Sequence, residues 1–200
     1  MSQLIAVFLP VYFLLFFGVA FLWRTWRTWK KTGLNAYTLM KNSGVEEVTN
    51  MYFRLLPPAV LLVMALYLYG PSTYELLAPF AWLEHVALQA GGMTLMTVAL
   101  VVMVIAQGQM GESWRIGVDH ENTTAFVQRG LFRYSRNPIF LGVVLSVVGY
   151  FLLLPNAVTL VIMMLDLALI QVQIRVEEQH LKARHGEEYE RYCRAVRRWI

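Results

Sequence analysis

The sequence predicts an all-α, polytopic membrane protein with five transmembrane helices and a cytosolic C-terminal helix. Hydrophobic residues make up 58% of the 200 residues, so most of the chain is apolar enough to lie in a bilayer. All 17 Lys and Arg residues fall in three stretches, residues 24–54, 115–136 and 175–198, with long apolar runs between them. Short loops rich in Lys and Arg stay on the cytosolic side of a membrane, which puts the three stretches inside and the N-terminus outside.

The first two spans lie on either side of the first basic stretch. Residues 3–23 supply the roughly 20 apolar residues that a helix needs to cross the hydrocarbon, and Arg24 follows at once. The basic start and the small-residue cleavage site of a signal peptide are missing, so we expect this span to be retained. The second span, about residues 55–69, leads to an outer loop, residues 70–79, that carries Glu75 and no cation.

The remaining three spans cover about residues 80–107, 138–154 and 157–174. Only Pro155 and Asn156 join the last two, a link that fits an antiparallel hairpin. A chain of this length has no room for a second soluble domain of ordinary size, so we expect one integral membrane domain, residues 1–200. Within it, residues 108–137 and 175–200 form the cytosolic part, where a water-soluble cofactor can bind.

The charge pattern argues against a nucleic-acid partner, and the cysteine count excludes an internal disulfide. The formal net charge is +4, but the cations lie beside the spans and are interleaved with Trp and Tyr. Anionic lipid headgroups explain such cations better than nucleic acid does, so we expect membrane lipids as partners and no nucleic acid. Cys193 is the single cysteine.

The two cytosolic segments have different local patterns. Residues 108–137 predict a loop with a short helical turn, and four glycines permit tight backbone turns there: Gly108, Gly111, Gly117 and Gly130. Residues 175–200 predict a helix that continues the last span, is interrupted at Gly186 and resumes with acidic residues in its first turn. Apolar side chains then recur at helical spacing and predict one stripe: Tyr189, Tyr192, Val196 and Trp199.

These two segments carry a resemblance to a known family. The run GLFRYSRNPIFLG, from Gly130 to Gly142, precedes the predicted hairpin, and Glu177-Glu178 follows it. This order resembles the isoprenylcysteine carboxyl methyltransferases and the related phospholipid methyltransferases. The signature of that group is close to G-x-[YF]-x-x-x-R-H-P-x-Y-x-G before the hairpin and E-E after it. The resemblance covers about half of the chain, from residue 107 onwards.

Two positions depart from the usual form of this signature. Asn137 stands where His is usual, and Phe140 stands where Tyr is usual. Asparagine can donate and accept hydrogen bonds but cannot titrate near neutral pH. No binding or catalytic role in this protein can therefore depend on an imidazole at position 137 or a phenol at position 140.

The resemblance implies a methyltransferase that takes S-adenosylmethionine from the cytosol and a lipophilic or prenylated acceptor from the bilayer. Arginine suits the carboxylate of the cofactor, glutamates suit its ammonium or ribose hydroxyls, and aromatic faces suit its sulfonium. The implied cofactor-binding residues are Tyr134, Arg136, Asn137, Pro138, Phe140, Gly142, Glu177, Glu178 and Tyr189. The implied acceptor is the carboxylate of an isoprenylcysteine-type substrate, and Arg115 and Arg194 are the candidates to orient it.

Several of these residues also have a purely structural interpretation. Arg136 stands beside a span, where topology alone calls for a cation; the two glutamates can form a solvated turn, and Tyr189 can be a packing residue. Asp166 lies within the fifth span and serves either a polar contact between helices or a contact to the substrate headgroup. Glu84 and His85 fit an interfacial role.

Two other classes of function stay open. A membrane sterol-type reductase has a comparable helical arrangement but needs NADPH, for whose second nucleotide this short C-terminal segment offers few groups. A non-catalytic membrane scaffold would keep the fold and bind neither cofactor. A metal site is disfavoured, because Glu177 and His180 make one Glu-x-x-His pair and the other His residues, His85, His120 and His185, supply no second set.

Overall fold

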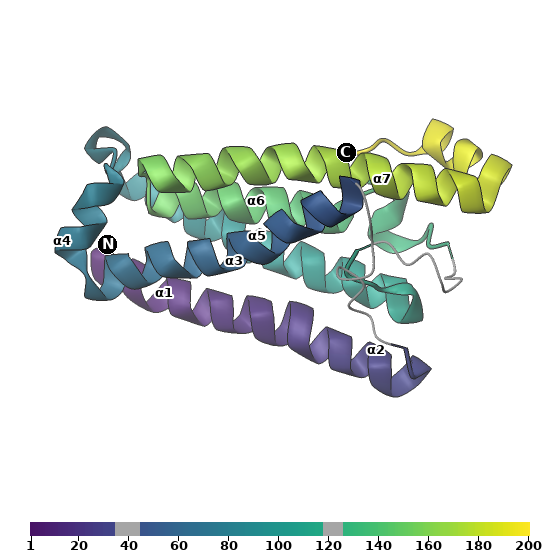
Figure 1. Ribbon diagram of the computed structural model, residues 1–200, viewed down its shortest axis with the longest axis horizontal. Helices are drawn as coiled ribbons and strands as arrows, with labels where there is room; N and C mark the ends of the chain where they lie inside the picture. The colour runs from purple at the N-terminus through teal and green to yellow at the C-terminus, as the bar shows by residue number, and fades with distance from the viewer. Residues whose placement is uncertain (35–44, 118–125) are drawn as a thin grey trace.

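The protein is a bundle of helices that run along one axis (Figure 1). The computed structural model describes residues 1–34, 45–117 and 126–200, with the backbone alone for residues 45 and 46. Within these ranges every regular element is helical, and one isolated β-bridge joins Pro79 to Asn156. The long helices are α1 (Ser2–Leu15), continued by a π-helical segment (Phe16–Trp23) and α2 (Arg24–Thr32), then α3 (Val45–Tyr69), α5 (Val86–Met110), α6 (Pro138–Leu153) and α7 (Ala157–Ala195).

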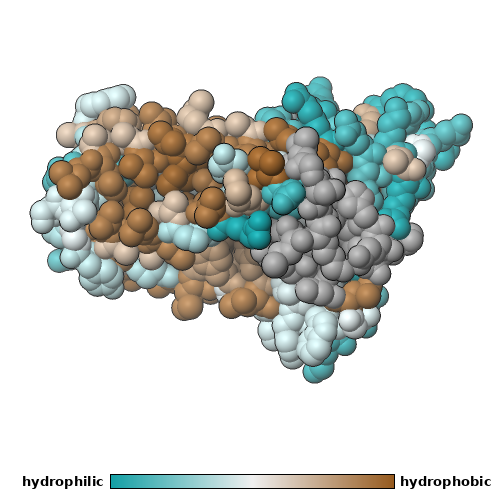
Figure 2. Space-filling view, in the orientation of Figure 1, coloured by the Kyte–Doolittle hydropathy of each residue, from teal (hydrophilic) through white to brown (hydrophobic). Residues whose placement is uncertain are grey.

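The described residues contain four helices that are long and apolar enough to cross a membrane: Ser2–Thr32, Glu47–Tyr69, Val86–Ser113 and Ala157–Ala195. The helix α6 is also apolar but shorter, with 16 residues. Apolar side chains cover the part of the surface toward the N-terminus, and polar side chains gather at the opposite end, where α7 ends (Figure 2). The protein is therefore an integral membrane protein with one polar end.

Close packing of α5 on α6 depends on glycine. A Cβ atom added to Gly92 would lie 2.7 Å from the Gly149 carbonyl oxygen, and one added to Gly149 would lie 2.7 Å from the Gly92 carbonyl oxygen. No real Cβ fits at such distances, so the two backbones touch only because both residues are glycine. Small residues allow this close approach between helices in membranes.

The helices α6 and α7 form the predicted antiparallel hairpin. Asn156 caps α7: its Oδ1 accepts from the Thr159 N–H at 2.9 Å, and the Asn156 N–H donates to Thr159 Oγ1 at 3.1 Å. This reciprocal pair is a capping box, which satisfies donors that a helix start leaves free. Asn156 Nδ2 also donates to the Tyr74 hydroxyl at 3.2 Å, which ties the hairpin turn to α4 (Pro71–Tyr74).

Two helices begin at other residues than the predicted spans, and one predicted interruption is confirmed. The helix α3 begins at Val45, because hydropathy marks its apolar core and not its polar first turns. The third long helix begins at Val86, since the preceding residues form a short 3-10 turn (Ala81–Leu83) and the Phe80 N–H donates to the Pro155 carbonyl at 2.7 Å. The helix α7 is interrupted at Gly186, with φ 50° and ψ −124°, as predicted.

The predicted apolar stripe stops early. The helix α7 ends at Ala195, and Val196 has an extended backbone, so only Tyr189 and Tyr192 of the four stripe residues lie on the helix. The Arg197 carbonyl accepts from the Arg136 N–H at 3.0 Å. The last residues therefore bond to the segment before α6 rather than continue their own helix.

Candidate functional site

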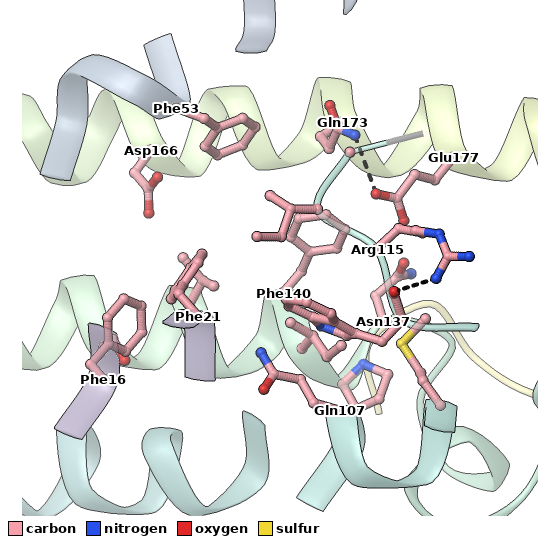
Figure 3. A pocket seen from close by; sticks show the side chains of 18 of the residues that line it. Phe16, Phe21, Phe53, Gln107, Arg115, Asn137, Phe140, Asp166, Gln173 and Glu177 are labelled. Atoms are coloured by element: carbon pink, nitrogen blue, oxygen red, sulfur yellow. Dashed lines mark hydrogen bonds between the residues drawn. The ribbon is translucent and has the colours of Figure 1, made fainter. Parts of the chain in front are cut away.

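A cavity of about 800 Å³ joins the polar end of the molecule to the space between the membrane helices. Figure 3 shows Arg115, Asn137, Gln173 and Glu177 gathered at one end of it and Asp166 among phenylalanines at the other. The apolar section is lined mainly by the first helix, α3, α6 and α7, through side chains such as Phe13, Phe16, Phe21, Phe53, Val143 and Ile162. The π-helical segment brings four of its residues to this wall, and π-helical turns are frequent at functional sites.

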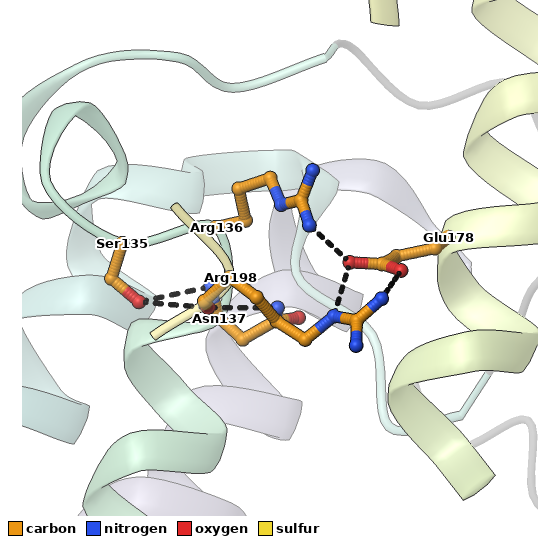
Figure 4. A network of polar contacts seen from close by, with 5 residues as sticks. All are labelled: Ser135, Arg136, Asn137, Glu178 and Arg198. Carbon is orange, nitrogen blue, oxygen red and sulfur yellow. Dashed lines mark hydrogen bonds and ion pairs between the residues drawn. The ribbon is translucent and has the colours of Figure 1, made fainter. Parts of the chain in front are cut away.

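Glu178 is held between two arginines at the polar end (Figure 4). Its Oε1 lies 3.0 Å from Arg136 Nη2, while Arg198 donates from Nε to Oε1 at 3.0 Å and from Nη2 to Oε2 at 2.7 Å. The hydrogen bonds to Glu178 raise the pKa of Arg198 above its ordinary value, so this guanidinium stays charged. The side chains of Arg136 and Glu178 are only 13% and 17% exposed, and salt screens such a pair less than a surface pair.

The C-terminal tail belongs to the same network. Asn137 Nδ2 donates to the Arg198 carbonyl at 3.1 Å, and Ser135 Oγ donates to the same carbonyl at 3.4 Å (Figure 4). The Asn137 N–H in turn donates to Ser135 Oγ at 3.1 Å. The segment before α6, the helix α7 and the tail are thus joined at one point, directly beside the cavity.

Among the described residues that line the cavity, two buried polar atoms have no hydrogen-bond partner: the donor Arg136 Nε and the acceptor Gln173 Oε1. Both residues line the cavity, and Gln173 Nε2 donates to Glu177 Oε1 at 3.2 Å. A buried polar atom without a partner costs about 1–3 kcal/mol. A cofactor with a carboxylate, an ammonium and a ribose diol supplies both kinds of partner, so these residues fit S-adenosylmethionine.

An aromatic group closes one side of the polar end. Tyr189 is 3% exposed, and its ring centroid lies 5.5 Å from that of Phe126. The Tyr192 hydroxyl donates to the Phe132 carbonyl at 2.6 Å, which fixes the last part of α7 against the 3-10 turn Gly130–Arg133. All of these aromatic side chains line the cavity. Tyr189 is therefore both a packing residue and a wall of the site.

Three more of the predicted site residues line this cavity: Pro138, Phe140 and Arg115. Arg115 Nη1 donates to the carbonyls of its own loop, Glu112 at 2.8 Å and Trp114 at 2.9 Å.

Three predicted site residues do not line it. Tyr134 is 73% exposed at the end of a 3-10 turn, and its side chain is not among those that face the cavity. Gly142 is buried against α5, where an added Cβ would collide with the Met103 side chain, so its place is explained by helix packing. Arg194 lines a second cavity of about 560 Å³, together with Arg175 and others.

Four residues at the site were not predicted from the sequence: Gln107, Phe126, Gln173 and Arg198. A sequence pattern could have indicated Gln173, because it is a polar residue in an apolar helix one turn before Glu177. No sequence pattern indicates Arg198, since its role depends on how the tail folds back. Of the histidines considered for a metal site, His120 lies outside the described residues. Among the described residues, no three His, Cys, Asp or Glu side chains are grouped so as to hold a metal ion.

The sequence also matches a model of a known protein family. The model for phospholipid methyltransferases matches residues 87–188, about half of the chain. The matched region runs from the start of α5 to just beyond Gly186 and includes α6 and most of α7. No curated protein matches the chain. The chain belongs to the phospholipid methyltransferase family, a family of integral membrane methyltransferases.

Proposed function

We propose that the protein transfers the methyl group of S-adenosylmethionine to a lipid-like acceptor, and that this acceptor is the carboxylate of an isoprenylcysteine-type substrate. The observation that carries the proposal is the continuity of one cavity from a charged end to an apolar section. A charged cofactor is stable at the first, and a prenyl or acyl chain gains about 0.8 kcal/mol per buried CH₂ in the second. The family supports S-adenosylmethionine as cofactor and a lipid-type acceptor.

The polar residues divide the work of binding the cofactor. In this proposal Arg136 binds its carboxylate through the free Nε, and Gln173 and Glu177 accept from its ammonium or ribose hydroxyls. Glu178 positions Arg136 through their ion pair. When bound, the cofactor supplies an already activated methyl group, so the protein mainly has to bind, orient and exclude water.

Arg115, rather than Arg194, receives the role of orienting the acceptor, because only Arg115 lines the large cavity. A carboxylate acceptor is anionic at neutral pH, so the displacement needs no strong base. Arg115→Gln should therefore raise the KM for the acceptor and leave cofactor affinity unchanged.

We also propose one domain with five spans, the N-terminus outside and the C-terminus cytosolic. With its 16 residues, α6 extends about 24 Å, which covers most of the ~30 Å hydrocarbon thickness. The polar end lies where α2 and α7 end, which supports a common cytosolic side for the basic stretches (Figures 1 and 2).

Calorimetric titration of the detergent-solubilised protein with S-adenosylmethionine and with NADPH tests the cofactor. We expect binding of the first only; binding of NADPH alone would indicate a sterol-type reductase, and binding of neither would indicate a scaffold. Methyl transfer from labelled cofactor then compares farnesylated N-acetylcysteine with an ethanolamine phospholipid. Label on the phospholipid alone would overturn the carboxylate acceptor and keep the methyltransferase.

A further inference from the structure

Asp166 is a buried carboxylate in the apolar section of the cavity. It lies on α7, is 7% exposed and lines the cavity. Within the described part of the chain, no hydrogen bond or ion pair joins its side chain to another residue. Figure 3 shows its carboxyl group directed into the space between α7 and the rings of Phe16 and Phe21, with Phe53 beside it.

The other polar side chains of this section have partners. The Tyr12 hydroxyl and Ser146 Oγ share a hydrogen bond of 2.6 Å, and the Tyr150 hydroxyl donates to the Val60 carbonyl at 2.8 Å. These groups therefore serve contacts between helices. Asp166 does not, which excludes for the described residues the interpretation of a polar contact between spans.

A carboxyl group at this depth is costly without a partner. Polar groups buried in an apolar environment lose free energy unless hydrogen-bonded, and ionisable residues within membrane helices face functional cavities as a rule. A hydrocarbon chain in the same cavity has no hydrogen-bond donor for the Asp166 carboxyl group. An acceptor with a hydrogen-bond donor in its membrane-embedded part offers the missing partner.

We propose, on the basis of the lipid-like acceptor above, that Asp166 is a specificity-determining residue that accepts a hydrogen bond from a hydroxyl or amine on the embedded part of that acceptor. The rise of a helix fixes where this donor must be. Asp166 precedes Gln173 by seven residues and Glu177 by eleven, so it lies about 10–16 Å along α7 from the cofactor-binding end. The preferred acceptor then carries a hydroxyl or amine on its embedded chain in addition to the carboxylate that receives the methyl group.

The test uses long-chain carboxylates that bind in competition with a fluorescent fatty acid. Stearic acid is compared with hydroxystearic acids that carry one hydroxyl at successive positions, and with the matching aminostearic acids. We expect the full-length protein to prefer one position over stearic acid by about tenfold, the effect of one hydrogen bond to a charged group. A larger preference for the amine than for the hydroxyl supports an ionised carboxylate, and equal preferences support a neutral one.

Two substitutions at position 166 and one control complete the design. Asp166→Leu should abolish the preference, and Asp166→Asn, which still accepts a hydrogen bond, should keep part of it. Ile162→Leu changes the shape of the same wall without its polarity and should keep all of it. A preference that survives in Asp166→Leu, or equal affinity for stearic acid and every functionalised chain, would overturn the proposal. If the parent protein prefers one functionalised chain but does not bind S-adenosylmethionine, the methyltransferase proposal is refuted. The role of Asp166 in selecting that chain is then still supported.

Discussion

Replacement of Glu178 by Gln should destabilise the protein through the two arginines that share this carboxylate. The substitution keeps the shape of the side chain and removes its charge. Arg136 and Arg198 would then lie beside one another without a common counter-charge, and the Arg136 side chain is only 13% exposed. A buried cation left without its partner is the main source of the expected loss.

The magnitude follows from the burial of each contact. The contact of Glu178 with Arg136 is largely buried and falls in the range of about 1.5–3 kcal/mol for hydrogen bonds to charged groups. The Arg198 side chain is 36% exposed, so its contact falls near the range of about 0.2–1 kcal/mol for exposed ion pairs. We expect Glu178→Gln to lower the free energy of unfolding by about 2–4 kcal/mol and Arg198→Ala by about 0.5–1 kcal/mol.

Denaturant titration of the detergent-solubilised variants, followed by tryptophan fluorescence, measures these losses. The matched control is Glu190→Gln, which breaks the Lys182–Glu190 pair of 2.9 Å, whose side chains are 65% and 44% exposed. We expect no measurable change in that control. In the double variant, adding Arg198→Ala to Glu178→Gln should lower the free energy of unfolding little further. Unfolding of Glu178→Gln at the same denaturant concentration as the control would refute the reasoning.

Three further predictions concern packing, topology and the tail. Gly149→Ala should destabilise by about 1–3 kcal/mol through overpacking, whereas Gly91→Ala, whose Cβ would have nothing within 4 Å, should be neutral or stabilising; thermal unfolding separates them. In a cysteine-free background, cysteines at the exposed positions Ser72 and Tyr134 should be labelled from opposite sides of a sealed vesicle, and labelling from one side would contradict five spans. Asn137→Leu should weaken cofactor binding, because its amide no longer holds the tail at the Arg198 carbonyl; full affinity in calorimetry would show that Asn137 is only a spacer.

Much of the fold could be predicted because its determinants are local. Apolar length and the distribution of Lys and Arg place helices without knowledge of their neighbours, and Gly186 and the capping residue Asn156 mark an interruption and a helix start. The contact between Gly92 and Gly149 could not be predicted, since it depends on which helices pack together. The start of α5 depends in the same way on a bond from Phe80 to the hairpin turn.

The candidate site was predictable where a motif constrained it. Arg136 and Glu178 are far apart in sequence, and the resemblance brought them together before the structure placed them 3.0 Å apart. Tyr134 was assigned by its position in the same run, but neighbours on a 3-10 turn point in different directions, and its side chain faces solvent. Arg198 enters only because the tail folds back after α7 ends.

The helix α7 connects the two ends of the cavity. Asp166 and Glu178 lie on the same helix, and its interruption at Gly186 comes after both of them. The distance between the apolar and the polar part of the site is therefore set by helix rise rather than by a loop. An acceptor held at Asp166 would bring its reacting group to a fixed depth beside Gln173 and Glu177. Selection by the position of a polar group along the acceptor chain is what such rigid spacing can provide, because the residues of α7 one turn to either side of Asp166, Ile162 and Ile170, are apolar.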